Sequence, residues 1–479
     1  MSAGPRLSAA LGPAAWERAH AELVEQVRAL IRLRTVNPPG DEIVAARHLA
    51  DALADAGVPA EILEPYPGRG SVVARLRGDG TGGDPLLLLS HTDVVPAPPE
   101  GWTHDPFGAE VADGFVWGRG AVDMKSMVAM ELVVMRLLAA EARAAGRDPA
   151  ADPVPGLRRD VIFAATADEE AGGVEGAAWL AENRPELLRA AGALNECGGV
   201  TVTVAGTRFY PIQVAEKGFA IWDVDVRGTW GHGSMPGDGT AGGNDENALL
   251  RAAELARRVA APGVPRLTPV MARFLDQLAA SVPPPTGRWL RRLADPDPSA
   301  AEAALAGVCS EPQRRALRAL LRDTCSPDVL VAGTRHNVIP GAATLTIDMR
   351  VLPGMSPATA EAELRARAGE DLWPHVTARL RLWGEPVEAP ADGPLWELMT
   401  GGLLAADPDG IPVPVMAPFA TDAKHAAKVG TPTYGFSPLR LGPEERFLDL
   451  FHGTDERVSL EALRFGLPVL YDVARRFCG

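Results

Sequence analysis

The chain has 479 residues, of which 46% are hydrophobic and 23% charged, an ordinary composition for a globular protein large enough for two or three domains. Its formal net charge of −15 disfavours nucleic acid as a partner, and its four cysteines are too few for a disulfide scaffold. No apolar run reaches the roughly 18 residues that a membrane-spanning helix needs, and the first residues lack an apolar signal core, so we expect a cytoplasmic protein.

Two helices are predicted near the start of the chain. Residues 16–34 carry apolar side chains at helical spacing, and residues 44–56 form a second helical pattern that Gly57 ends. Strand and helix patterns then alternate to about Val214, as expected for an α/β domain. Within this stretch, residues 139–157 are rich in Ala, Arg, Asp and Pro, and we expect them to form an exposed extension.

His91 follows the first strongly apolar run, the four leucines at residues 86–89. Four consecutive leucines predict a buried strand, so His91 leaves the end of this strand, and Asp93 stands two residues further on. A metal-ligating imidazole usually gives its other N–H to an oxygen acceptor, and Asp93 is the nearest candidate for that acceptor. A lone histidine after a strand is more often structural, but the His-x-Asp spacing favours a metal ligand.

Two further acids stand beside glycines. Asp123 closes the sequence GRGAVD, just before a helix predicted over residues 126–140, and a helix N-cap is the alternative interpretation of this residue. Glu196 follows another short apolar run and precedes two glycines. The glycines in both segments permit close backbone approach and positive φ.

The triplet Asp168-Glu169-Glu170 is the most informative feature of the chain. It ends an apolar run, residues 161–167, that predicts a buried strand. Three adjacent acids at a strand end repel one another and resist burial, a conflict that a multivalent cation would resolve. A solvated acidic loop is the alternative, and the triplet alone does not decide between them. The ligand-type residues at the three other segments favour the cation.

The region that begins near Val214 has a different pattern. Residues 220–227, 344–350 and 375–383 alternate apolar and polar side chains, which predicts half-buried antiparallel strands. Residues 248–259 predict a helix between the first two of these strands. The sequence therefore predicts a second, smaller α+β unit.

Nine motifs stand in order along the chain: SHTDVVP, GRGAVDMK, ADEEAGG, NECGG, GHGSMPG, HNVIPG, DMRVLPG, ATDA and FHGTDERV. With them, the chain from about Trp16 to Phe477 resembles the family of acetylornithine deacetylase, succinyl-diaminopimelate desuccinylase, aminoacylase and glutamate carboxypeptidase, which are di-zinc amide hydrolases. It looks closest to carboxypeptidase S-like members. The resemblance implies an α/β, zinc-exopeptidase-like catalytic domain with a mixed central sheet flanked by helices, and an inserted α+β lid or dimerisation domain. The implied boundaries are residues 1–213 and 385–479 for the catalytic domain and residues 214–384 for the lid.

The same resemblance implies a site for two divalent metal ions, zinc by preference, with cobalt or manganese able to use the same ligands. With Asp123 bridging the two ions, His91 and Glu196 would complete one site. Glu170 and His452 would complete the other. The family also has a cis peptide after the bridging aspartate, so we expect one between residues 123 and 124.

Four more residues receive roles from the resemblance. Glu169 matches the general base. His232 matches a lid histidine that reaches the substrate carbonyl in the other subunit of dimeric relatives, which implies a homodimer; a surface turn is the alternative. Arg350 resembles a cation that grips a substrate carboxylate, with an ion pair to an acid on its own strand as the alternative. Asn337 matches a polar residue that lines the cleft.

The implied activity is release of a C-terminal amino acid from a short peptide or from an N-acyl amino acid. Glu196, where strict dipeptidases more often have Asp, favours the acylase and carboxypeptidase S-like members. A biosynthetic deacylase of a small N-acylated amine is an alternative. A catalytically inactive protein that binds peptides or acyl amino acids is another, although it would have no use for the general base Glu169.

The chain departs from the family pattern at two places. Phe419-Ala420 stands where the loop before Thr421, which lies near the carboxylate end of the substrate in the family, usually carries two glycines. The lid also contains an insert, residues 265–327, with three consecutive prolines and helical stretches at 286–293 and 299–322. The insert would cover the cleft or alter dimerisation.

Overall fold

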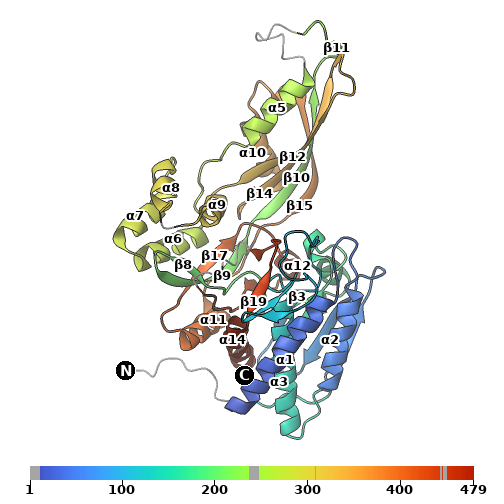
Figure 1. Ribbon diagram of the computed structural model, residues 1–479, viewed down its shortest axis with the longest axis vertical. Coiled ribbons are helices and arrows are strands. Elements are labelled where there is room, and N and C mark those ends of the chain that lie inside the picture. Colours follow the sequence, from blue (N-terminus) through green and yellow to red (C-terminus); the bar gives the residue numbers. More distant parts are fainter. Residues whose placement is uncertain (1–10, 237–246, 308, 443–444, 446–449) are drawn as a thin grey trace.

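The computed structural model describes residues 11–236, 247–307, 309–442, 445 and 450–479, which form a large α/β body and an elongated second unit that projects from it (Figure 1). The body is built on a mixed sheet with the strand order β1-β2-β6-β3-β7-β18-β9-β16, and β17 and β8 also pair with β9. The strands are β1 (Ala60–Leu63), β2 (Ser71–Leu76), β3 (Leu86–His91), β6 (Val161–Thr166), β7 (Gly192–Asn195), β8 (Val202–Val204), β9 (Thr207–Glu216), β16 (Val387–Glu388), β17 (Ile411–Ala417) and β18 (Thr433–Gly435).

Helices cover both faces of this sheet. One face packs against α1 (Pro13–Arg32), α2 (Ile43–Asp55), α3 (Lys125–Ala144) and α14 (Leu460–Cys478), whose apolar side chains form one large cluster. The other face packs against α4 (Ala177–Asn183) and α12 (Ala423–Lys428). A small sheet of β4 (Val111–Ala112), β5 (Phe115–Trp117) and β19 (Arg457–Ser459) lies beside them, and α11 (Gly393–Ala406) packs on α14.

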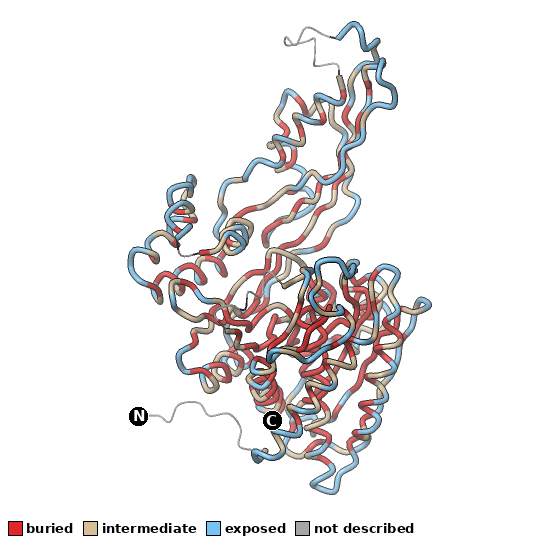
Figure 2. The backbone as a smooth tube through the Cα atoms, viewed as in Figure 1, coloured by how far each residue is buried: buried red, intermediate tan, exposed pale blue. Residues whose placement is uncertain are grey.

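The four leucines of β3 show why this strand is apolar without alternation. Leu86 and Leu88 lie in the cluster of α1, α3 and α14, whereas Leu87 and Leu89 lie in the cluster of α4 and α12. A strand covered on both faces buries every side chain, as parallel strands in α/β sheets commonly do. In Figure 2 the central strands are buried along their length, which confirms the buried strands predicted before His91 and before the acidic triplet.

The second unit is an antiparallel sheet with the order β12-β14-β10-β15. Its strands are β10 (Gly218–Arg227), β12 (Thr324–Ala332), β14 (Ala342–Val351) and β15 (Val376–Gly384), and α5 (Ala248–Val259) and α10 (Pro357–Ala368) pack against them. Trp222, Val224 and Val226 are buried while their neighbours are less so, as the alternation predicted. At the far end, β11 (Gly231–His232) pairs with β13 (Val338–Ile339), and we call the whole unit the lid (Figure 1).

The described residues of the insert form four helices: α6 (Pro269–Ser281), α7 (Pro284–Arg292), α8 (Ser299–Leu305) and α9 (Glu311–Leu320). The single helix expected over 299–322 was wrong, because Ser310 begins a new helix with a capping box to Gln313. Helix α6 was not expected. Its buried Phe274 and Leu278 belong to the hydrophobic cluster of the body rather than to that of the lid, and α6 packs against β17 and β9. By their packing, the helices of the insert are thus part of the body.

One further expectation needs correction. Residues 139–157 were expected to be an exposed extension, but α3 continues to Ala144, and Ala139 and Ala142 are fully buried in the main core.

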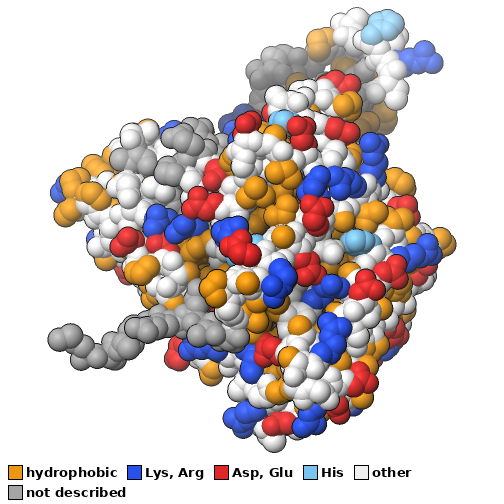
Figure 3. Space-filling model, turned by 60° about the horizontal axis from the view of Figure 1, so that its bottom comes forward, with side chains coloured by type: hydrophobic (Ala, Val, Ile, Leu, Met, Phe, Trp, Pro, Cys, Tyr) orange, Lys and Arg blue, Asp and Glu red, His pale blue; other side chains and the backbone are white. Residues whose placement is uncertain are grey.

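The mixed α/β sheet flanked by helices, with a separate α+β unit, confirms the predicted fold class. Over the face drawn in Figure 3, acidic and basic side chains are interspersed rather than gathered into one patch. No helix among the described residues is long and apolar enough to cross a membrane.

Candidate metal centre

The candidate residues converge because three neighbouring strands of the body end at one edge of the sheet. Strands β6 and β7 both run parallel to β3, so their carboxyl ends lie together. His91 ends β3, Glu169 and Glu170 form the turn after β6, and Glu196 follows β7. The other two candidates come from loops: Asp123 lies just before α3, and His452 lies before β19.

Asp123 lies between the two histidines and presents one carboxylate oxygen to each. Its Oδ1 is 3.3 Å from Nε2 of His91, and its Oδ2 is 3.3 Å from Nε2 of His452. Each imidazole faces one more carboxylate: Glu196 Oε2 lies 3.6 Å from His91, and Glu170 Oε2 lies 3.1 Å from His452. Two sets of ligand-type side chains therefore share one central aspartate.

Glu169 lies on the His91 side of this arrangement. One ligand-type atom from each of His91, Glu169 and Glu196 falls within 4.8 Å of the others. Lys424 Nζ is 3.8 Å from Glu169 Oε1 and donates to the backbone oxygen of Thr421. Burial raises the pKa of Glu169 well above its ordinary value, and the neighbouring Glu196 adds to this, while Lys424 opposes it.

The residues present fit a pair of divalent cations. His91, Asp123 and Glu196 are almost fully buried, and a buried cluster of acids is costly without positive charge. Burial alone lowers the pKa of His91, but Glu196, Asp123 and Asp93 together raise the pKa of this imidazole well above its usual range. The buried Nε2 of His91 makes no hydrogen bond although it faces two carboxylates. Imidazole and carboxylate groups that face a common centre are the ligand set of catalytic zinc sites.

The backbone at the centre is strained at three non-glycine positions. Asp168, Cys197 and His452 have φ values of 71°, 70° and 54°, in the left-handed region. Each of them either is or adjoins one of the candidate site residues, and such strain is typical of functional sites, where the surroundings hold it in place. The cis peptide expected between Asp123 and Met124 is confirmed.

Asp93 does more than the sequence predicted. Its Oδ1 lies 3.3 Å from Nδ1 of His91, and its backbone oxygen lies 3.1 Å from the same nitrogen, as expected for an orienting partner. The same carboxylate also accepts the backbone N–H groups of Glu169 and Glu170, each at 3.1 Å. It thus ties the end of β3 to the turn after β6.

Asp168, the first acid of the triplet, belongs to a buried ion-pair network. Its carboxylate accepts from Asn37 Nδ2 at 3.2 Å, from Arg69, and from the backbone N–H of Glu175 at 2.9 Å. Arg69 also pairs with Glu42. Sequence reasoning missed Asn37, Glu42 and Arg69, since these residues lie 99 or more positions from the triplet or outside any motif.

The loop that carries the ATDA motif joins several strand ends. Thr421 donates its backbone N–H and its hydroxyl to Glu216 at the end of β9, and accepts from Asn195 Nδ2 at the end of β7 at 2.9 Å. Asp422 accepts from Thr166 at the end of β6 at 2.7 Å. The rings of Phe419 and Phe451 lie 6.5 Å apart, so the position expected to differ from the family pattern carries an aromatic pair.

Three predicted residues lie elsewhere. His232 is exposed on β11, at the far end of the lid from the strand ends of the body, and its Nδ1 lies 2.7 Å from Oγ of Ser234 (Figure 1). Asn337 lies beside it, accepting from Gly233 through its backbone oxygen. Arg350, on β14, makes a two-pronged ion pair with Asp348 on its own strand, which was the alternative for this residue.

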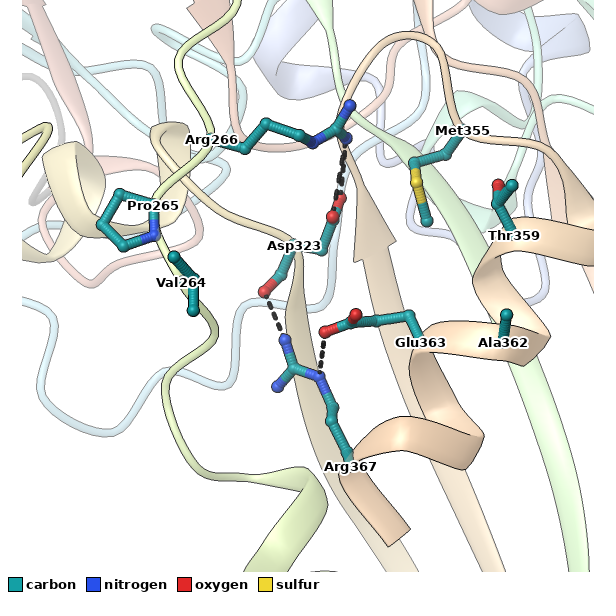
Figure 4. Close-up of a pocket in the computed structure, with 9 residues that line it drawn as sticks. All are labelled: Val264, Pro265, Arg266, Asp323, Met355, Thr359, Ala362, Glu363 and Arg367. Atoms are coloured by element: carbon teal, nitrogen blue, oxygen red, sulfur yellow. Dashed lines mark hydrogen bonds and ion pairs between the residues drawn. The ribbon is translucent and has the colours of Figure 1, made fainter. Parts of the chain in front are cut away.

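A hollow of about 590 Å³ lies at the junction of the lid and the insert, and none of the predicted site residues lines it (Figure 4). Its charged side chains are paired with one another. Arg367 donates to Glu363 at 2.8 Å and to the backbone oxygen of Asp323 at 3.0 Å, and Arg266 lies 3.4 Å from the carboxylate of Asp323. Because none of the predicted site residues lines the hollow, it is separate from the candidate metal centre.

The fold and the centre together define an α/β metallohydrolase. The profile of Peptidase family M20/M25/M40 matches residues 87–476, so the chain belongs to this family. It is 28% identical over 457 residues to aminoacylase-1 from Sus scrofa, with 92% of each chain covered. It is 26% identical over 414 residues to the N-fatty-acyl-amino acid synthase/hydrolase PM20D1 from Bos taurus, covering 83% of this chain and 75% of that protein. Among solved structures, the M20 metallo-carboxypeptidase Sso-CP2 from Sulfolobus solfataricus superposes with a TM-score of 0.65 at 14% identity, covering 95% and 99% of the two chains.

Proposed function

We propose that this protein is a two-metal amide hydrolase that releases the amino acid from an N-acyl amino acid or the C-terminal residue from a short peptide. The observation that carries the proposal is the position of Asp123, whose two oxygens face two histidines that each face a further glutamate. This is the arrangement needed to hold two ions through a shared carboxylate.

The relatives support the substrate class. Aminoacylase-1 and PM20D1 are named for N-acyl amino acids, and the structural neighbour Sso-CP2 is named a carboxypeptidase. Both reactions cleave an amide bond next to a free carboxylate, so the same metal ligands and general base can serve either substrate. Glu196 in place of Asp favours the acylase and carboxypeptidase side of this range.

The proposed ligands are His91, Asp123, Glu170, Glu196 and His452, with zinc as the preferred metal and cobalt or manganese as substitutes. Two divalent ions held there supply Lewis acidity, which polarises an amide carbonyl and makes water a stronger acid. Glu169 takes the proton from the attacking water and delivers it to the nitrogen of the leaving amine, so that the amine departs uncharged. The carboxylate of Asp93 holds the imidazole of His91 and the backbone of Glu169 in the positions that this proton transfer requires.

We infer that His232 acts on the substrate carbonyl of a partner subunit in a homodimer. Its position at the far end of the lid, exposed and away from the strand ends of its own body, supports a role in trans. A donor that is aimed at the developing oxyanion lowers the barrier to amide hydrolysis. Asn337, beside His232, is proposed to line the same composite cleft, and Arg350 is proposed to exchange its Asp348 partner for a substrate carboxylate.

We propose that residues 1–213 and 385–479 form the catalytic domain and that residues 214–384 are inserted into it as the lid. Strands β10, β12, β14 and β15 and the separate hydrophobic cluster of the lid support this division. The helices of the insert, which lie inside residues 214–384, pack with the catalytic body instead.

A hydrolysis screen tests the proposal. N-acetyl and long-chain N-acyl amino acids, dipeptides and a small N-acylated amine without a carboxylate are offered to the purified protein, before and after chelation and after adding back zinc, cobalt or manganese. We expect hydrolysis of the carboxylate-bearing substrates, loss on chelation and recovery with metal. Activity that persists after complete metal removal would defeat the mechanism, and preference for the amine without a carboxylate would favour the biosynthetic deacylase.

A further inference from the structure

A buried carboxylate outside the candidate ligands joins the two loops of the metal centre. Glu456 stands four residues after His452 and is 0% exposed. Its Oε2 accepts from Arg119 Nη1 at 2.5 Å and from the backbone N–H of Gly120 at 3.0 Å. Its Oε1 accepts from the backbone N–H groups of Val122 at 2.8 Å and of Asp123 at 3.1 Å. One side chain thus receives four donors from the segment that ends in Asp123.

Further bonds join the same two segments. The backbone oxygen of Glu456 accepts from Gly118 N–H at 2.9 Å, and Arg119 Nη2 donates to the backbone oxygen of Gly453 at 3.0 Å. Next to them β19 pairs with β5, with Arg457 opposite Trp117. Through Gly453 and Glu456, the segment 452–457 is therefore joined by several hydrogen bonds to the segment 118–123, although the two lie more than 330 residues apart in the chain.

This contact bears on the metal centre because each segment carries a ligand candidate. Asp123 is the central carboxylate, and Oδ2 of Asp123 faces His452 at 3.3 Å. Neither residue lies in a helix or strand, so regular secondary structure does not fix the distance between them. His452 is also the more exposed histidine, with a side chain 55% accessible, so few packing contacts hold it in place.

We propose that Glu456 is a positioning residue that holds the Asp123 loop and the His452 loop in register, and so sets the affinity of the centre for its second divalent ion, the one next to His452 and Glu170. This inference rests on the proposed two-metal function and adds to it the residue that assembles the two halves of the site. Glu456 itself touches neither histidine and is not a ligand. Partners of this kind commonly change metal affinity 10–100-fold when they are altered.

A merely structural ion pair is the competing explanation, and the chain contains a matched control for it. Asp407 is likewise buried, 4% exposed, and likewise accepts from an arginine, Arg208 at 2.6 and 2.7 Å, and from a further donor, the hydroxyl of Tyr210 at 2.7 Å. It lies beside the first residues of β9, whereas Glu216, which contacts the ATDA loop, ends the same strand. Removing the charge of Asp407 should therefore lower the free energy of unfolding without altering the metal centre.

The experiment titrates Zn²⁺ alone into the metal-free full-length protein in competition with a chelating dye, and compares the parent with Glu456→Gln, Arg119→Lys and Asp407→Asn. The carboxamide of Glu456→Gln places an NH₂ group against backbone N–H donors, so the Asp123 loop must shift. We expect the parent to bind two ions. Glu456→Gln should bind the second ion at least 10-fold more weakly than the parent. Arg119→Lys should show a smaller loss of affinity for this ion, and Asp407→Asn should bind both ions as the parent does.

The outcomes distinguish the positioning role of Glu456 from a merely structural ion pair and from the proposed two-metal function. Parent-like binding of two ions by Glu456→Gln, or equal weakening by Asp407→Asn, overturns the positioning role and leaves the proposed function standing. A parent that binds fewer than two ions removes the proposed function and the positioning role with it. If Glu456→Gln does not fold, as judged by circular dichroism and thermal unfolding, Arg119→Lys decides: zinc affinity within twofold of the parent overturns the proposal.

Discussion

The catalytic body and the far end of the lid hold their candidate residues in opposite ways. In the body, every candidate ligand but His452 is buried or nearly so, and partners from distant segments fix its surroundings, as Asp93 does for the turn at Glu169. At the far end of the lid, His232 is exposed, and its ring nitrogen contacts Ser234 only two residues away.

The difference shows which part of the proposed site is complete within one chain. A preorganised centre needs side chains whose positions are fixed before the substrate arrives. The body meets this requirement, whereas the far end of the lid would meet it only when a substrate or a second subunit surrounds His232.

Replacing Glu169 by glutamine should cause the largest loss. The amide cannot accept the proton of the attacking water, so we expect kcat to fall about a thousandfold while metal binding persists. Steady-state kinetics with the best substrate of the screen, together with zinc stoichiometry, measure both. Glu182→Gln, an exposed acid on α4 of the same body, serves as control and should retain full activity. Undiminished turnover by Glu169→Gln would remove the general base from the mechanism.

His232→Ala tests the lid side of the contrast. We expect kcat to fall about a hundredfold with little change in zinc affinity or thermal stability, because the side chain is exposed and lies far from the ligands. Mixing inactive His232→Ala with inactive Glu169→Gln should restore activity after subunit exchange, since one composite site of the mixed dimer keeps both residues. Mixed dimers that are demonstrated by mass spectrometry and remain inactive would contradict the role in trans.

The body was largely predictable because its signals are local. A run of four leucines must be buried, and a histidine or an acid at its end must then lie at the sheet edge. In the lid, the helix over residues 248–259 was likewise predicted with the bounds that it has. The pairing of Oδ1 and Oδ2 of Asp123 with two different histidines agrees with the bridging role taken from the family resemblance, which no pattern within this chain would have indicated.

Most of the contacts that the sequence did not reveal join residues that lie far apart in the chain. Arg69 and Glu456 are single charged residues that bind groups far along the chain. Arg69 binds Asp168, 99 positions away, and Glu456 binds a segment more than 330 positions away, so no local pattern marks either contact. The missed break between α8 and α9 is different, because Ser310 and Gln313 carry a capping-box signal in the sequence itself. The packing of the insert helices with the body joins residues far apart in the sequence, such as those of α6 and β17, and no local pattern indicates it.

A matched pair of core truncations tests where the insert belongs. Leu278 on α6 and Leu345 on β14 are 3% and 2% exposed, so each change to alanine should cost about 3 kcal/mol through lost burial and a cavity. Native-state hydrogen exchange should show weaker protection of β9 and β17 in Leu278→Ala, and weaker protection of β10 and β14 in Leu345→Ala. If Leu278→Ala weakened the lid strands instead, the assignment of the insert to the body would be wrong.

The smallest expected effect is a pH dependence of stability that arises in the body. His425, 6% exposed beside the ATDA loop, lies with Nε2 2.9 Å from the backbone oxygen of Gly172, and burial together with the positive charge of Lys424 lowers its pKa to about 3. Because an unfolded histidine titrates near 6.5, the unfolded chain binds more protons between these values, so stability is full above pH 6.5 and falls as the pH drops toward 3. Between pH 7 and pH 5 this histidine should account for a loss of about 2 kcal/mol.

Denaturant unfolding of the parent and of His425→Asn at both pH values measures this loss. The substitution removes the hydrogen bond to Gly172 at every pH, which lowers the free energy of unfolding by a constant amount, so only the difference between pH 7 and pH 5 reports the titration. The parent should lose about 2 kcal/mol more over that interval than His425→Asn does. The metal-binding groups titrate in both proteins and cancel in the comparison. Equal losses in the two proteins would mean that His425 gains its proton in the folded state as readily as in the unfolded state, and that this part of the body is more open to water than its packing indicates.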